Sequence, residues 1–171
     1  MTFNSGLEGV VAAETVLSEV DGEAGRLVLR GHRLQDIAGR RSVEWLIAEL
    51  WRGFVQGNLS EPSLRRDLAA MRVAVFDDIL PLLPQAARLT PIEALRLLLA
   101  AVPDDAPDLP LRLTATVAVG LAAVLRSRAG AAPVRPDAGL TVTNYWARTP
   151  GTTRASVSAV RTARWAPASP W

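Results

Sequence analysis

Two residue types that carry much of enzyme chemistry are missing or nearly missing from this sequence. Its 171 residues include no cysteine and a single histidine, His32. The absence of cysteine excludes disulfides, thiolate catalysis and cysteine metal sites. One histidine excludes a zinc site built on several histidines and any mechanism that needs two histidines within this chain.

Lysine is also absent, and acidic residues are absent from the last part of the chain. All 19 basic residues are arginine, and the net charge is only +2, so the total charge does not indicate a nucleic-acid surface. Residues 1–140 carry 15 arginines and 17 acids, a net charge of −2, whereas residues 141–171 carry 4 arginines and no acid, a net charge of +4. The net charge of the sequence therefore changes from slightly negative to positive near Leu140.

Aromatic residues are few, at 5%, although hydrophobic residues make up 49% of the sequence. The apolar mass is mostly alanine, leucine and valine, which favours helices over sheets. The N-terminus has no basic segment followed by an apolar one, so no signal peptide is expected and the cytoplasm is the default location. The apolar run Leu111–Leu125 is shorter than the roughly 20 residues of a membrane span, and we predict a buried core helix there, with no membrane partner.

A β-hairpin is predicted over residues 16–30. Two short apolar runs, 16–20 and 26–30, flank a turn in which Gly22 and Gly25 can supply the positive φ angles of a tight reversal. An isolated hairpin is marginal in water, so it should pack on another element.

Helices are predicted over the rest of the chain up to residue 140. Serines at 42 and 60 are plausible N-caps for helices over 42–52 and from 60 to about 75, and a short helix over 77–83 is expected to end at Pro84. Thr90 and Glu93 have the spacing of a capping box, with Pro91 at the first helical position. Beyond Leu140 the helical periodicity fades, and disorder is expected.

No residue is assigned to a catalytic, cofactor-binding or metal-binding role. His32 lies beside Arg30 and Arg33, which disfavour its cationic form, and a surface or packing role is preferred to that of a general base. Two groups of charged residues are likewise interpreted as solvated surface rather than as binding sites. The acids Glu14, Glu19, Asp21 and Glu23 lack the spacing of a calcium loop. The paired arginines Arg40-Arg41 and Arg65-Arg66 could contact phosphates, but solvated helix faces are preferred.

The first fifty residues resemble the start of the citrate synthase family, which includes the methylcitrate synthases. The resemblance rests on a glycine-leucine opening, a serine-x-x-aspartate-glycine hairpin, an arginine-glycine pair and a helix that ends with leucine-tryptophan-x-glycine. These stand here as Gly6-Leu7, Ser18 to Gly22, Arg30-Gly31 and Leu50 to Gly53. A weaker resemblance continues through Thr90 to Arg96 and the 111–126 helix, so that the match covers about residues 6–140.

The resemblance implies a mainly α fold, a fragment of the helical large domain with a small N-terminal β-hairpin. Residues 1–140 would form the N-terminal part of a citrate synthase-like domain, and residues 141–171 would be a divergent tail. Citrate synthases condense acetyl-CoA with oxaloacetate by means of a carboxylate base, histidines and arginines. In the family these groups lie beyond the matched region, so none is carried over to this chain.

Three explanations of the missing part stay open: a frameshift near codon 140, one half of a split enzyme, or a genuine short paralogue. In each case the chain alone is expected to be inactive, and acetyl-CoA and oxaloacetate would bind only if the C-terminal part were supplied. The alternative is a non-enzymatic interaction module. The apolar helices predict self-association or pairing with a citrate synthase-like chain, and no nucleic acid partner is expected.

Overall fold

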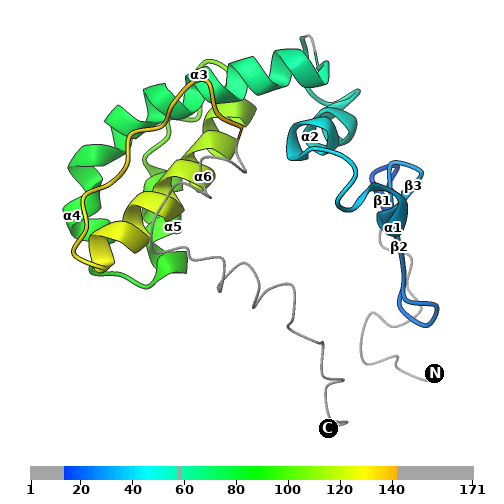
Figure 1. Cartoon of the computed structure of the whole chain (residues 1–171), viewed down its shortest axis with the longest axis horizontal. Helices are drawn as coiled ribbons and strands as arrows, with labels where there is room; N and C mark the ends of the chain where they lie inside the picture. The colour runs from blue at the N-terminus through cyan, green and yellow to red at the C-terminus, as the bar shows by residue number, and fades with distance from the viewer. Residues whose placement is uncertain (1–13, 58, 142–171) are drawn as a thin grey trace, which may run out of the picture. The chain divides into compact units, whose positions relative to one another are not determined.

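The computed structural model describes residues 14–57 and 59–141, which fall into two compact units (Figure 1). The N-terminal unit comprises Met1–Phe54 and the C-terminal unit Val55–Trp171. The first combines short strands with two helices, and the second is helical. The fold is therefore mainly α with a small N-terminal sheet, as predicted. The expected disorder of the tail falls on residues 142–171, outside the described part.

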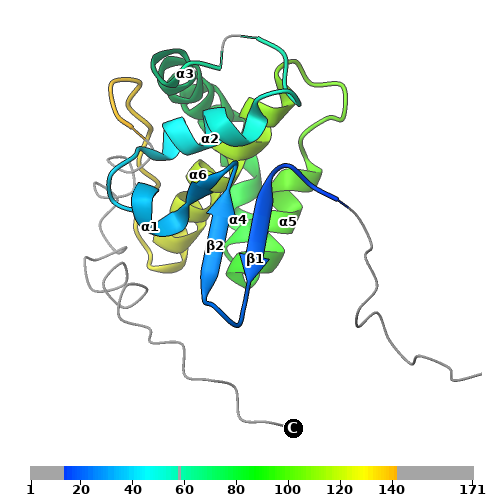
Figure 2. The same cartoon turned by 90° about the vertical axis from the view of Figure 1, so that its right-hand side faces the viewer.

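The described part of the N-terminal unit contains a three-stranded antiparallel sheet (Figure 2). Strand β1 (Ser18–Asp21) pairs with β2 (Arg26–Leu29), which confirms the hairpin. Of the two turn glycines, Gly25 has a positive φ of 59°, whereas the expectation of a positive φ at Gly22 is wrong. The Asp21 carboxylate accepts a hydrogen bond from the Ala24 amide at 2.9 Å and so helps to close the turn.

The third strand and the first helix were not predicted. Strand β3 (His32–Arg33) pairs with β2 through a two-residue turn, and helix α1 (Leu34–Ile37) follows at once. The turn residues Arg30 and Gly31 have φ values of 50° and 83°. Both angles are positive, as in a type I′ hairpin turn, and such a φ is costly for a side chain as large as arginine.

The strained Arg30 caps the second helix of the same unit. Helix α2 (Val43–Trp51) begins after Ser42, whose hydroxyl accepts a hydrogen bond from the Trp45 amide at 3.0 Å, and Gly53 follows its end with a φ of 83°. Arg30 donates from Nε to the Glu49 carbonyl at 2.9 Å and from Nη2 to the Arg52 carbonyl. A cation at this end of a helix opposes the negative pole of its dipole.

Helix α3 (Glu61–Ile79) opens the C-terminal unit. Ser60 caps it as predicted, but the predicted break near Val75 and the separate helix over 77–83 are wrong, because α3 continues to Ile79. A 3-10 turn, η1 (Leu80–Leu82), and helix α4 (Leu83–Ala86) follow. Pro84 therefore lies in the first turn of α4 and does not end a helix, since the amide that proline lacks has no partner in a first turn.

Helices α5 (Pro91–Ala100) and α6 (Leu109–Arg128) complete the helical core with α3. The capping box at Thr90 and Glu93 is present, with Pro91 at the start of α5. The buried cluster joins side chains from α3 to α6: Val75, Phe76, Ile79, Leu83, Ala86, Ala94, Leu98, Ala115, Val119, Ala122, Ala123 and Val124. The small residues of α6 let its neighbours approach closely. A Cβ added at Gly120 would lie 2.7 Å from Leu98 Cδ1.

Helix α6 is, among the described residues, the one helix long and apolar enough to cross a membrane by length and composition. It has 20 residues, a mean hydropathy of 1.5 over its most apolar window, and 44% of that window buried. The core helix of a soluble protein meets the same criteria. Eight of its residues are buried, which agrees with the core helix predicted for this run.

An extended segment after α6, residues 131–141, runs back along α3 and is drawn in orange in Figure 1. Arg135 forms a bidentate ion pair with Asp77, with both N–O distances at 2.7 Å, and its guanidinium lies 5.6 Å from the centre of the Phe76 ring. The hydrogen bond from Arg135 lowers the pKa of Asp77. Arg72, which is buried in α3, donates to the Leu140 carbonyl. Arg126 of α6 donates from Nε to the Ala132 carbonyl at 2.7 Å, so arginines hold this segment at three points.

Candidate functional site

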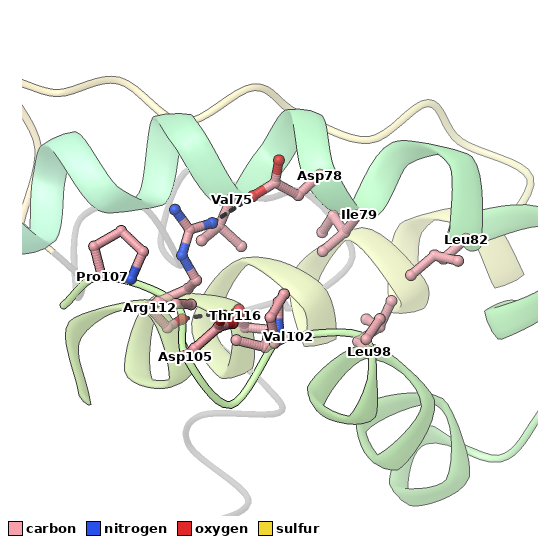
Figure 3. Close-up of a pocket in the computed structure, with 13 residues that line it drawn as sticks. Val75, Asp78, Ile79, Leu82, Leu98, Val102, Asp105, Pro107, Arg112 and Thr116 are labelled. Atoms are coloured by element: carbon pink, nitrogen blue, oxygen red, sulfur yellow. Dashed lines mark hydrogen bonds and ion pairs between the residues drawn. The ribbon is translucent and has the colours of Figure 1, made fainter. Parts of the chain in front are cut away.

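A pocket of about 580 Å³ lies within the C-terminal unit (Figure 3). Five stretches build it: the last turns of α3, the 3-10 turn η1, the end of α5, the loop that follows α5 and the first turns of α6. A volume of this size is within the range of roughly 300–1,000 Å³ that is typical of small-molecule sites. Its lining consists of Val75, Asp78, Ile79, Leu82, Leu98, Ala101, Val102, Pro103, Asp105, Ala106, Pro107, Arg112 and Thr116.

The polar groups of the pocket centre on Arg112. Its Nη1 donates to Asp78 Oδ2 at 2.6 Å, and the Thr116 hydroxyl donates to its backbone carbonyl at 2.8 Å. The Arg112 side chain is 22% exposed and that of Asp78 is 60% exposed, so this ion pair is close to water and contributes about 0–1 kcal/mol to stability. The Nε–H of Arg112 is buried and has no hydrogen-bond partner within the described part of the chain.

The two ends of the pocket differ in character. Figure 3 shows Arg112, Asp78 and Asp105 toward one end and Leu82 and Leu98 at the other. Leu98 is 1% exposed and Ile79 is 3% exposed, so the apolar end is continuous with the helical core. The pocket is therefore amphipathic, with charged groups near its mouth and aliphatic side chains within.

Carboxylates outnumber cations around this pocket. The charged residues that line it are Asp78, Asp105 and Arg112, which sum to −1. The loop over residues 103–108 adds Asp104 and Asp108 and no base, so that the local charge reaches −3. A cavity with this excess of one sign attracts ligands of the opposite charge.

The reactive groups that line the pocket are few. Its lining includes no histidine, cysteine, lysine or serine. Its single hydroxyl, that of Thr116, donates to the Arg112 backbone carbonyl. The carboxylates of Asp78 and Asp105 are the lining groups that can accept hydrogen bonds from a ligand or take up a proton.

The structure places the other candidate residues outside this pocket. His32 lies in the N-terminal unit, where its ring meets that of Trp45 edge-on at 5.1 Å between centroids, an arrangement that fits the packing role. The guanidinium of Arg41 also contacts Trp45 and lies 5.1 Å from the centre of its ring. These aromatic contacts account for the side chains without a catalytic role.

The acidic and basic clusters form ordinary surface pairs where the structure records a partner. Glu19 and Asp21 both pair with Arg26, at 3.0 and 3.4 Å, and Glu61 pairs with Arg65 one helical turn away at 2.7 Å. Within residues 14–57 and 59–141, no three histidine, cysteine, aspartate or glutamate side chains gather as ligands for a metal ion. The tail arginines lie beyond Thr141, outside the described residues.

Sequence reasoning missed the pocket. Its lining comes from residues 75–116, which are brought together only by the packing of α3, α5 and α6. The available signal was the run Pro103 to Asp108, in which three aspartates and two prolines lie between two apolar helices.

Comparisons with known proteins all point to one family. The sequence model described as "Citrate synthase, C-terminal domain" matches residues 6–165. The citrate synthase of Haloferax volcanii is 34% identical over 151 residues, and the 2-methylcitrate synthase of Mycobacterium tuberculosis is 30% identical over 150 residues. These alignments cover 79% and 81% of this chain.

The solved structures agree at the level of the fold. The crystal structure of citrate synthase from Thermotoga maritima MSB8 superposes with a TM-score of 0.69, at 23% sequence identity, over 86% of this chain. The chain spans only part of these proteins: 40% of the Haloferax relative, 37% of the Mycobacterium relative and 41% of the Thermotoga chain.

Proposed function

Because this chain belongs to the citrate synthase family, we propose that it supplies an N-terminal, non-catalytic part of an enzyme that condenses acetyl-CoA with oxaloacetate. On this proposal the chain is inactive alone. The observation that carries the proposal is the combination of a family match over residues 6–165 with coverage of only 40% of the Haloferax citrate synthase.

The residue inventory supports inactivity. The reaction must remove a proton from an acetyl methyl group and stabilise the enolate that forms, which takes a base and several hydrogen-bond donors held in place. The only histidine of the chain, His32, packs on Trp45 in the N-terminal unit. The pocket of the C-terminal unit holds two aspartates, of which Asp78 is paired with Arg112.

Release of free CoA tests this proposal directly. The full chain is mixed with acetyl-CoA and oxaloacetate, and the thiol is measured with a colorimetric thiol reagent. A parallel reaction with propionyl-CoA covers the chemistry of the 2-methylcitrate synthase relative. We expect no release above the protein-free blank in either reaction. Turnover by the purified chain, reproduced in a second preparation, would overturn the assignment of inactivity.

Complementation separates an incomplete enzyme from an unrelated binding protein. The remaining 60% of the Haloferax enzyme, which the chain does not match, is co-expressed with this chain. If this chain supplies the missing N-terminal part, citrate formation should appear only when both polypeptides are present. Activity from the Haloferax part alone would show that this chain contributes nothing to the reaction.

A second candidate function, a non-enzymatic interaction module, is favoured by the apolar surface of the C-terminal unit. Ile92 of α5 is 67% exposed and Val117 of α6 is 41% exposed. Partly buried leucines lie at helical spacing from each of them, namely Leu95 and Leu99 on α5 and Leu113 and Leu121 on α6. Apolar stripes of this kind are commonly covered by a partner chain.

Light scattering during size-exclusion chromatography tests this second function. On this proposal the chain self-associates, or co-elutes with a full-length citrate synthase, and Val117→Asp weakens the association. Ala70→Asp introduces the same charge at an exposed position of α3 and serves as the matched control. A monodisperse monomer that retains no full-length relative would rule out the interaction function.

A further inference from the structure

We propose that the pocket between α3, α5 and α6 binds an amphipathic organic cation, that is, an ammonium or guanidinium head on an apolar body. The inference rests on the charge, shape and lining of the pocket. It is independent of the condensation chemistry proposed above, and its test does not involve CoA or oxaloacetate.

The charge of the mouth selects the head group. Asp105 and Asp78 line the pocket, against the single lining cation Arg112. The Asp78 carboxylate meets Arg112 through Oδ2, so its other oxygen and the Asp105 carboxylate remain as acceptors for a donor on the ligand. An anionic ligand would face repulsion from these two carboxylates, whereas a cation gains charge-assisted hydrogen bonds.

The interior selects the apolar body. Ile79, Leu82 and Leu98 line the end away from Arg112 in Figure 3, and Val75 and Val102 line its sides. A bare hydrated cation would leave this surface uncovered. An aliphatic or aromatic body removes it from water, which is favourable by about 25 cal/mol for each Å² of apolar surface. A pocket of 580 Å³ has room for such a body.

Arg112 adds one further requirement. Its Nε–H is buried and has no hydrogen-bond partner in the part of the chain that the structure describes. A buried donor left without a partner is unfavourable, so a ligand that places an acceptor beside it gains more than one that does not. The preferred ligand therefore also carries a carbonyl, sulfonyl or hydroxyl oxygen that can accept from this N–H.

A fluorescent amine tests the proposal with the full chain. Dansylcadaverine joins an aromatic body and a sulfonyl group to a primary ammonium, and dansylglycine carries the same body with a carboxylate in place of the ammonium. Binding is followed by fluorescence polarisation at low salt. We expect dansylcadaverine to bind at least tenfold more tightly than dansylglycine, and the difference to shrink as salt is added.

Three variants locate the binding. Asp105→Asn removes a lining carboxylate and should weaken the binding of dansylcadaverine by about threefold to fivefold, as expected for a solvent-exposed ion pair. Asp104→Asn makes the same change one residue away, outside the lining, and should stay within about twofold of the wild type. Ala101 is exposed at the rim, and Ala101→Trp should fill the opening and reduce binding by more than tenfold.

The outcomes are decisive in both directions. Charge-selective binding that Ala101→Trp abolishes supports the proposal. Equal affinity for the two dansyl probes overturns it. An equal loss of binding in the Asp104 and Asp105 variants also overturns it, because either result would show that the lining carboxylates do not select the probe. If circular dichroism shows that Ala101→Trp is unfolded, the comparison of the two surface aspartate variants decides alone.

Discussion

Replacing Gly120 by alanine measures how closely α5 and α6 approach. The added Cβ would lie 2.7 Å from Leu98 Cδ1, well inside the ~3.5–4.0 Å of ordinary carbon contact. Leu98 is 1% exposed and belongs to the core cluster, so its Cδ1 can yield toward the pocket that it lines but must give up packing in the core. The overpacking cost of ~1–3 kcal/mol should exceed the gain of ~1 kcal/mol in helix propensity. We therefore expect a net loss of ~1 kcal/mol in the free energy of unfolding.

Shortening Leu98 should reverse the sign of this effect. Leu98→Ala removes the atom that an added Cβ would meet, and by itself should cost ~2–5 kcal/mol. In that background Gly120→Ala keeps its helix-propensity gain and meets no such contact, so it should stabilise the chain by ~1 kcal/mol. The two substitutions are then coupled by ~2 kcal/mol.

Urea unfolding of the four proteins, followed by circular dichroism at 222 nm, measures this coupling. The m values of the four proteins must agree, since a change in m would indicate a change in the unfolded or native ensemble. If Gly120→Ala has the same effect with leucine and with alanine at position 98, the close approach of the two helices plays no part and the reasoning is refuted.

Three further predictions concern polar contacts. Arg30→Ala removes two hydrogen bonds to the end of α2 and should speed hydrogen exchange of the amides in that helical turn by at least threefold, with α5 as the unaffected reference. Asp77→Asn breaks the bidentate pair with Arg135 and should raise exchange across residues 131–141, and an unchanged rate would show that the pair does not hold the segment. Hydrogen bonds from Thr90 lower the pKa of Glu93 from 4.5, so the capping box stabilises α5 fully above pH 4.5 and loses this contribution as pH falls through the lowered pKa. The difference in urea midpoint between wild type and Glu93→Ala should accordingly shrink below pH 4.5.

The helix starts could be predicted because their causes are local. Ser42, Ser60 and Thr90 each accept a hydrogen bond from an amide three residues later, and this spacing is visible in the sequence. The helical fold class followed from composition and periodicity for the same reason. Strand β3 and helix α1 were missed because two and four residues are too short to show a period.

The features that were missed depend on contacts distant in sequence. Arg30 reaches carbonyls 19 and 22 residues away, and that contact helps to offset the strain in its φ. The pocket depends on Asp78 and Arg112, which are 34 residues apart. The ion-pair partner and the buried Nε–H of Arg112 follow from how α3 packs on α6.

The arginine contacts on residues 131–141 also determine how the chain carries mechanical load. Tension applied to the polypeptide beyond Thr141 passes from the Leu140 carbonyl through Arg72 into the middle of α3. The Arg135–Asp77 pair lies next along the path, and the hydrogen bond from Arg126 Nε to the Ala132 carbonyl joins the start of the segment to the last turn of α6. A pull on this end therefore meets these side-chain contacts one after another before it separates the helices of the core.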